Sequence, residues 1–159
     1  MALSKGSASS GYDNVWYDIV LKGLKSTLTS EIPGVRIYIA PSILYADNYQ
    51  IRIWGAEANT ESYGIDYWNK TYTSEIFLYM IDKNPQEKTY EQLYSDSEKL
   101  YQALHNVKSK TLTSSNNSFT WLDGKAESIT VNDFEEEEED IDGLLSASFT
   151  HTCVVERAE

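Results

Sequence analysis

Apolar residues first recur at helical spacing between positions 13 and 32 of the chain. Asp13 or Asn14 can cap this helix with a side-chain oxygen, and Pro33 followed by Gly34 can end it. The apolar positions are Val15, Ile19, Leu24 and Leu28. The pattern predicts an amphipathic helix of about five turns. The Ser/Gly-rich residues 1–12 that precede it are expected to form a flexible N-terminal arm.

Three segments further on have the patterns of strands. Residues 35–40 (VRIYIA) and 49–54 (YQIRIW) alternate apolar and polar positions with β-branched residues, which is typical of half-buried antiparallel strands. The short link between them, residues 41–48, makes them neighbours in the predicted sheet. Residues 75–82 (EIFLYMID) are apolar on both faces, which predicts the central strand.

A second helix is predicted after Pro85. Thr89 and Gln92 have the spacing of a capping box, with Thr89 as the N-cap. Two stripes follow at helical spacing, the apolar Leu93, Leu100 and Leu104 and the aromatic Tyr90, Tyr94 and Tyr101. We expect the leucines to face the core. We interpret the tyrosines as the edge of the core rather than a ligand site.

The C-terminal third predicts further strands. Asp123-Gly124 lies between residues 118–122 and 125–133 and is a strong hairpin signal, and residues 145–157 alternate as a final strand. The predicted fold is therefore α+β, a mixed, mostly antiparallel sheet with two flanking helices. The predicted order is helix, three strands, helix, hairpin, strand, in a single domain over residues 13–159.

Residues 55–72 differ from the strands around them because they are polar yet contain Tyr63, Tyr67 and Trp68. We predict a long loop here. Its aromatic rings either remain exposed for a partner or pack back onto the edge of the sheet. Together with Trp54 at the end of the preceding strand, these rings are candidate interface residues, because Tyr and Trp combine apolar area with a polar tip.

The charge of the chain is concentrated in one short run. The formal net charge is −12, and seven of the 25 acidic residues belong to this run: Glu135, Glu136, Glu137, Glu138, Glu139, Asp140 and Asp142. We interpret it either as a solvated loop that prevents edge pairing or as a surface that repels other anions. Such a chain is a poor candidate for broad binding to a nucleic-acid backbone.

Residue types with catalytic or metal-binding chemistry form no recognisable constellation. A calcium loop that begins at Glu138 would place Phe149 where a bidentate carboxylate is needed. Gly64, Gly124 and Gly143 each stand alone, so they form no phosphate loop. His151 and Cys153 share one strand face, which we interpret as core. We therefore expect no enzyme activity, no catalytic, cofactor-binding or metal-binding residues, and no cofactor.

The location of the protein is also suggested by its sequence. Cys153 is the single cysteine, which suits a reducing compartment. The first ten residues have no apolar leader, and the longest apolar run is the six residues Ile76–Ile81, too short to span a membrane. We therefore expect a soluble protein that is cytosolic where it is made.

Four features together resemble the tail-terminator (tail-completion, head–tail joining) proteins of long-tailed bacteriophages. They are the N-terminal helix Val15–Leu28 with its strand Val35–Ala40, the strand Glu75–Asp82 with the leucine helix, the Trp121-Leu122-Asp123-Gly124 hairpin, and the C-terminal strand Ser146–Glu156. The resemblance covers residues 13–157 and rests on the pattern and order of elements. The aromatic segment 55–72 and the acidic run depart from what the family predicts.

The resemblance implies a structural function in the tail or neck of a virion. The family forms six-membered rings that cap the tail tube and join it to the head connector, so the implied partners are further copies, the tail tube protein and the head–tail connector protein. DNA would pass through without specific binding, and the acidic run would line the channel. Assembly would take place in the host cytoplasm. The alternatives are another neck component, a monomeric acidic adaptor and an enzyme with a scattered site.

Overall fold

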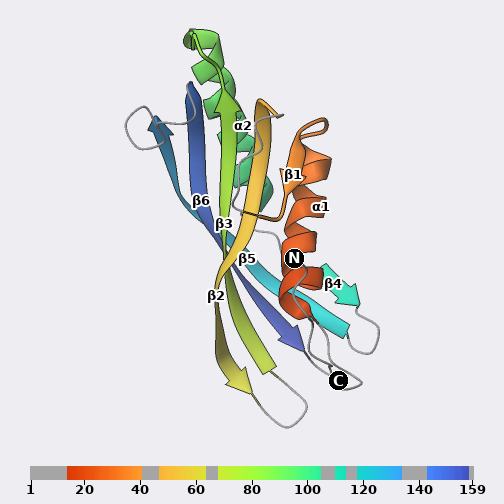
Figure 1. The fold of residues 1–159 in the computed structure, drawn as a ribbon. Helices are drawn as coiled ribbons and strands as arrows, with labels where there is room; N and C mark the ends of the chain where they lie inside the picture. Colours follow the sequence, from red (N-terminus) through yellow and green to blue (C-terminus); the bar gives the residue numbers. More distant parts are fainter. Residues whose placement is uncertain are drawn as a thin grey trace, which may run out of the picture.

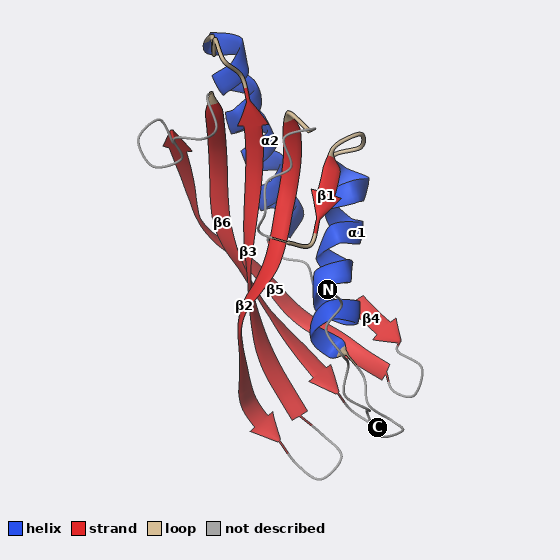
Figure 2. Cartoon of the chain, in the orientation of Figure 1, coloured by secondary structure: helices blue, strands red, loops and turns tan. Residues whose placement is uncertain are grey.

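The computed structural model describes residues 14–40, 47–63, 68–104, 110–113, 118–133 and 143–157. Within these ranges, six strands form one sheet in the order β1-β2-β3-β6-β5-β4, with two helices packed on one face (Figures 1 and 2). The strands are β1 (Arg36–Tyr38), β2 (Tyr49–Tyr63), β3 (Trp68–Ile81), β4 (Lys110–Thr113), β5 (Ser118–Asp133) and β6 (Leu144–Arg157). The α+β class and the mixed, mostly antiparallel sheet are confirmed. The predicted arm, residues 1–12, lies outside the described residues.

The N-terminal helix begins as the π-helical segment η1 (Val15–Leu21) and continues as α1 (Lys22–Glu31). Asn14 is its N-cap, since the side chain accepts a hydrogen bond from the backbone N–H of Tyr17 at 3.1 Å. The helix ends before Pro33, where Gly34 takes a φ of +89° that other residues rarely adopt. The predicted limits of this helix are confirmed.

Trp16 brings η1 unusually close to the sheet. A Cβ atom at position 55 would lie 2.6 Å from Cε2 of the Trp16 indole, so the approach requires the glycine that is present. The same ring meets Tyr72 edge to face, with centroids 5.8 Å apart. The aromatic pair therefore fixes the start of the helix over β2 and β3.

The second helix, α2 (Glu87–Leu104), begins two residues before the predicted N-cap. The hydroxyl of Thr89 accepts a hydrogen bond from the backbone N–H of Gln86 at 3.3 Å, while the N–H groups of Thr89 and Tyr90 donate to the carbonyl of Gln86. Thr89 is thus the third helical residue and not the cap, which corrects the prediction. One half of the capping exchange is present, displaced by three residues, with Gln86 at the N-cap and the Thr89 side chain at N3.

The core lies between the helices and the sheet. Ten side chains there are essentially fully buried: Leu24, Leu28, Ile51, Ile53, Ile76, Leu78, Leu93, Leu100, Leu104 and His151. Burying one leucine contributes about 1.5–3 kcal/mol, so this set supplies much of the driving force for folding. The inward position of the α2 leucines is confirmed. Tyr90 and Tyr101 pack at the core edge as predicted, whereas Tyr94 is 55% exposed.

The β1–β2 pair is parallel, although both strands were predicted to be antiparallel. Ile37 pairs with Ile51 in parallel register, so β2 starts at the same end of the sheet as β1. Period-two alternation reports which faces are buried and carries no information on strand direction. The prediction that the two strands are neighbours is confirmed.

The predicted loop at residues 55–72 is wrong, because this segment consists mostly of strand. β2 continues to Tyr63 and β3 starts at Trp68, and the two pair from Trp54↔Glu75 to Tyr63↔Trp68. Residues 56–60 are all exposed, which explains their polar composition. The segment extends past the N-terminal helix in Figure 1. Polar character here reflects solvent contact and not the absence of regular structure.

The predicted hairpin at Asp123-Gly124 is also wrong. β5 runs through both residues and pairs with β6 along its length, with an irregularity between Trp121 and Asp123 that is typical of a β-bulge. The hairpin in this region joins β4 to β5, from Lys110↔Trp121 to Thr113↔Ser118. Long-range pairing with β6 therefore overrides the local turn signal.

Candidate interaction surfaces

The face of the sheet that lies away from the helices carries a row of aromatic rings. Trp54 of β2 stacks on Phe77 of β3 with centroids 4.7 Å apart, and Phe77 stacks on Tyr79 with centroids 5.5 Å apart. Trp54 and Phe77 are half-buried and Tyr79 is buried. We call Trp54, Phe77 and Tyr79 the aromatic row. It provides rigid apolar area of the kind enriched at protein interfaces.

Arg52 lies on the same face as the aromatic row. It is 2% exposed, its guanidinium lies 4.1 Å from the ring centroid of Tyr38, and its Nε donates to Oε1 of Gln50 at 2.8 Å. Burial lowers the pKa of Arg52, an effect opposed by the nearby Tyr38 and Asp47. The Tyr38 hydroxyl in turn donates to Asp47. Gln50 and Arg52 are buried, so this part of β2 is covered on both faces and not half-buried as predicted.

The predicted interface residues fall in two places. Trp54 belongs to the aromatic row, whereas Tyr63 and Trp68 are paired at the far ends of β2 and β3. Tyr63 lies nine positions beyond Trp54 along β2, which is about 30 Å. Tyr67 lies outside the described residues. The structure therefore brings Tyr63 and Trp68 together but leaves Trp54 apart from them.

The acidic run Glu135–Asp142 lies outside the described residues, but both of its attachment points are defined. Asp133 ends β5 opposite Leu145 of β6, and the carbonyl of Gly143 accepts a hydrogen bond from the N–H of Asp82 at 2.9 Å. The run therefore leaves the sheet at the end of β5 and re-enters it at the start of β6.

Two long strand edges have no neighbour among the described residues. β1 covers β2 only at Gln50–Arg52, and β4 covers β5 only from Ser118 to Trp121. The uncovered stretches are residues 53–63 of β2 and 123–133 of β5, which we call the β2 edge and the β5 edge. They lie on opposite sides of the sheet. Each presents backbone N–H and C=O groups that can pair with another strand.

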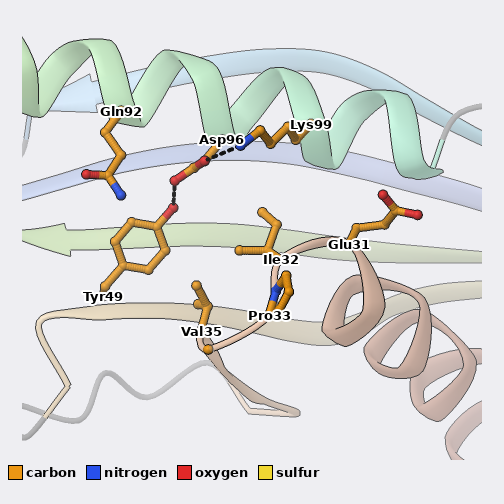
Figure 3. Close-up of a pocket in the computed structure, with 9 residues that line it drawn as sticks. Glu31, Ile32, Pro33, Val35, Tyr49, Gln92, Asp96 and Lys99 are labelled. Carbon is orange, nitrogen blue, oxygen red and sulfur yellow. Dashed lines mark hydrogen bonds and ion pairs between the residues drawn. The ribbon is translucent and has the colours of Figure 1, made fainter.

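A groove of about 450 Å³ separates the end of α1 from α2 (Figure 3). Its floor holds a polar chain, in which the Tyr49 hydroxyl donates to Asp96 and Lys99 lies 3.7 Å from the same carboxylate. Burial and the hydrogen bond to Asp96 raise the pKa of Tyr49, so its hydroxyl keeps its proton. These groups satisfy one another and tie β2 to α2.

A second groove, of about 440 Å³, lies along the outer side of α1. It is lined by Tyr17, Lys22, Lys25, Ser26, Thr29, Ser30 and Ile39, and we call it the lysine groove. No acidic residue lines it. Lys22 forms an ion pair with Asp18 at 3.6 Å and lies 5.2 Å from the Tyr17 ring centroid. The groove is therefore a basic, hydroxyl-rich surface on a strongly acidic chain.

The histidine and cysteine side chains of the described residues are buried in the core. His151 is 0% and Cys153 1% exposed, both on the helix side of β6, as predicted. Burial raises the pKa of the Cys153 thiol to about 12, so it stays protonated at neutral pH. Within the described part of the chain, no group of three His, Cys, Asp or Glu side chains is placed to hold a metal ion. None of the described helices is long and apolar enough to cross a membrane.

Two surfaces were missed in the sequence, although both left a signal. Phe77 and Tyr79 alternate with Ile76 and Leu78, which predicts that the two rings share the outer face of β3. In α1, the lysines and hydroxyl residues of the groove recur at positions 22, 25, 26, 29 and 30, the spacing of one helix face.

No protein-family model matches the sequence, and a search of curated proteins finds no significant match.

Proposed function

We propose that this protein is a structural virion protein that forms a ring, caps the tail tube of a long-tailed bacteriophage and joins the tail to the head connector. The observation that carries the proposal is the pair of uncovered strand edges on opposite sides of one sheet. A protein with two different complementary surfaces associates head to tail, and such an interface closes into a ring when the rotation per copy permits.

The strand directions suit this association. β2 is antiparallel to β3, β3 to β6 and β6 to β5, so β2 and β5 run in opposite directions. Copies related by rotation about an axis along the strands therefore bring the β2 edge of one copy antiparallel to the β5 edge of the next. Each backbone hydrogen bond formed contributes about 0.5–1.5 kcal/mol, and the ring repeats the interface in every copy.

The aromatic row and the paired ends of β2 and β3 supply further contact area. Trp54 and Phe77 retain exposed surface for a partner. In the proposed assembly these surfaces meet the tail tube protein or the connector protein, and DNA passes through the opening without specific binding.

The test is the assembled mass of the full chain, measured by native mass spectrometry, with negative-stain images to show symmetry. We expect particles of six chains with a central opening, either alone or after mixing with purified tail tubes. A protein that stays monomeric at high concentration and does not bind tube ends would refute the ring and favour the acidic adaptor.

A further inference from the structure

We infer that the lysine groove on α1 of one copy binds the acidic run Glu135–Asp142 of a neighbouring copy. This inference rests on the proposed ring for the presence of the neighbour. The inference connects two features of opposite charge. One is a groove that has two lysines and no acidic lining residue, and the other is a run of seven acidic residues.

The groove has the chemistry that a carboxylate-rich segment needs. Lys25 is exposed and has no ion pair within the described part of the chain. The charge of Lys22 is only partly compensated by Asp18, because the Lys22 side chain is 56% exposed and the ion pair is solvated. The hydroxyl groups of Tyr17 and Ser26 can donate hydrogen bonds to carboxylates. The Ile39 side chain supplies an apolar wall.

The acidic run gains from such a partner. Adjacent carboxylates repel one another, and a lysine within about 4 Å offsets part of that repulsion. Charge-assisted hydrogen bonds between ammonium or hydroxyl groups and carboxylates are also stronger than neutral ones. The groove between α1 and α2 has one lysine, Lys99, beside the acidic Glu31 and Asp96, whereas the lysine groove has two lysines and no acidic lining residue, which makes it the better match for the run.

The run is too short to lie in the groove of its own copy. Nine residues separate Asp133 from Gly143, so the middle of this stretch reaches about 17 Å from its attachment points. β5 lies four strands from β1, a distance of about 19 Å, and the groove lies beyond β1 against the helix layer. Figure 1 shows α1 and β1 on the opposite side of the molecule from the end of β5 and the start of β6.

The same geometry fits the proposed ring. The run leaves the sheet at the β5 edge, and the groove lies on the side of the β2 edge. An association that brings the β5 edge of one copy to the β2 edge of the next therefore also brings the run towards the neighbour's groove. In this arrangement the docked run would sit at the periphery of the interface, which is an alternative to the expected position along the channel.

The first experiment is zero-length cross-linking of lysine amines to carboxylates in a mixture of ¹⁴N- and ¹⁵N-labelled chains. We expect cross-links from Lys22 or Lys25 to the run that join one light and one heavy peptide. Cross-links only within one label class, or rings without this cross-link, would overturn the inference while leaving the ring proposal intact.

The second experiment reverses the charge of the groove with Lys22→Glu and Lys25→Glu. We expect about tenfold weaker association in low salt, because two exposed ion pairs are lost. Reversing Glu136 and Glu138 to Lys in the partner copies should restore association. Lys83→Glu with Lys88→Glu is the matched control, since it makes the same charge change on exposed residues outside the groove.

A peptide spanning residues 133–144 tests the groove when no ring forms. It should bind the folded chain in a salt-sensitive manner, and its binding should be lost when the five glutamates become glutamine or when both groove lysines are reversed. Peptide that binds the reversed variant equally well would refute the inference. Tighter binding of a single-stranded oligonucleotide than of the peptide would assign the groove to nucleic acid instead and would also overturn it.

Discussion

Cys153 and Tyr72 lie opposite each other on β6 and β3, and burial changes the acidity of both. Burial raises the pKa of the Cys153 thiol to about 12 and that of the Tyr72 hydroxyl to about 12. Both groups are neutral in the folded protein across the physiological range. The thiol is therefore a small apolar core group, which agrees with the interpretation drawn from the alternating pattern of this strand.

The raised pKa of Cys153 predicts a dependence of stability on pH. An unfolded thiol ionises near its ordinary pKa of 9.0 whereas the folded thiol ionises near 12, so the free energy of unfolding is unaffected below the lower value and falls as pH rises between them. Urea unfolding at several pH values in this window measures the slope. Cys153→Ala should reduce the slope, with Tyr72→Phe removing a further part. An unchanged slope in Cys153→Ala would contradict the prediction.

At the scale of elements, the helices and single strands could be predicted because their signals are local. Asn14 and Pro33-Gly34 mark the limits of the first helix, and the spacing of the α2 leucines identifies its buried face. Thr89 shows the limit of such signals. Its capping interaction can form in two registers, and the structure adopts the one in which the Thr89 hydroxyl also donates to Asp82 at 2.6 Å.

The two faces of α2 predict different costs of truncation. Leu100→Ala removes a fully buried side chain and should lower the free energy of unfolding by about 2–5 kcal/mol. Tyr94→Ala is the matched control, because Tyr94 is 55% exposed and its loss should change stability by about 0.5 kcal/mol or less. Chemical denaturation of both variants measures the difference. Equal losses would mean that the face of the helix is assigned incorrectly.

At the scale of the whole molecule, the sheet order could not be predicted, because it depends on pairing between distant segments. Asp123-Gly124 is a turn signal that is overridden when Gly124 pairs with Cys153 across the sheet. Residues 55–72 look like a loop because one edge is exposed to solvent, and only the pairing with β3 and β6 identifies them as strand. The aromatic row likewise needs Trp54 and Phe77 from different strands. The two points where the acidic run joins the sheet could be predicted, by contrast. The predicted strands 125–133 and 145–157 place these points within one residue of the observed end of β5 and start of β6.

The sheet order predicts a gradient of amide hydrogen exchange. β3 and β6 are paired on both sides, so their amides should exchange most slowly, whereas outward-facing amides of the β2 edge and β5 edge should exchange fast in the isolated chain. Assembly should slow exchange at both edges together. Hydrogen exchange followed by mass spectrometry, before and after assembly, measures this change. Assembly without protection at either edge would show that the ring uses other surfaces.

The partial cover of the two outer strands has a consequence for the shape of an assembly. The middle of the β2 edge is level with Cys153 when it is followed across the sheet to β6. The middle of the β5 edge is level with a point on β6 about three to four residues closer to Leu145. A neighbour that aligns the two edges fully is therefore shifted along the strands by about 12 Å. Repeated without correction, that shift produces a spiral staircase. A flat ring closes only if every sheet leans relative to the symmetry axis, as strands do in a closed barrel.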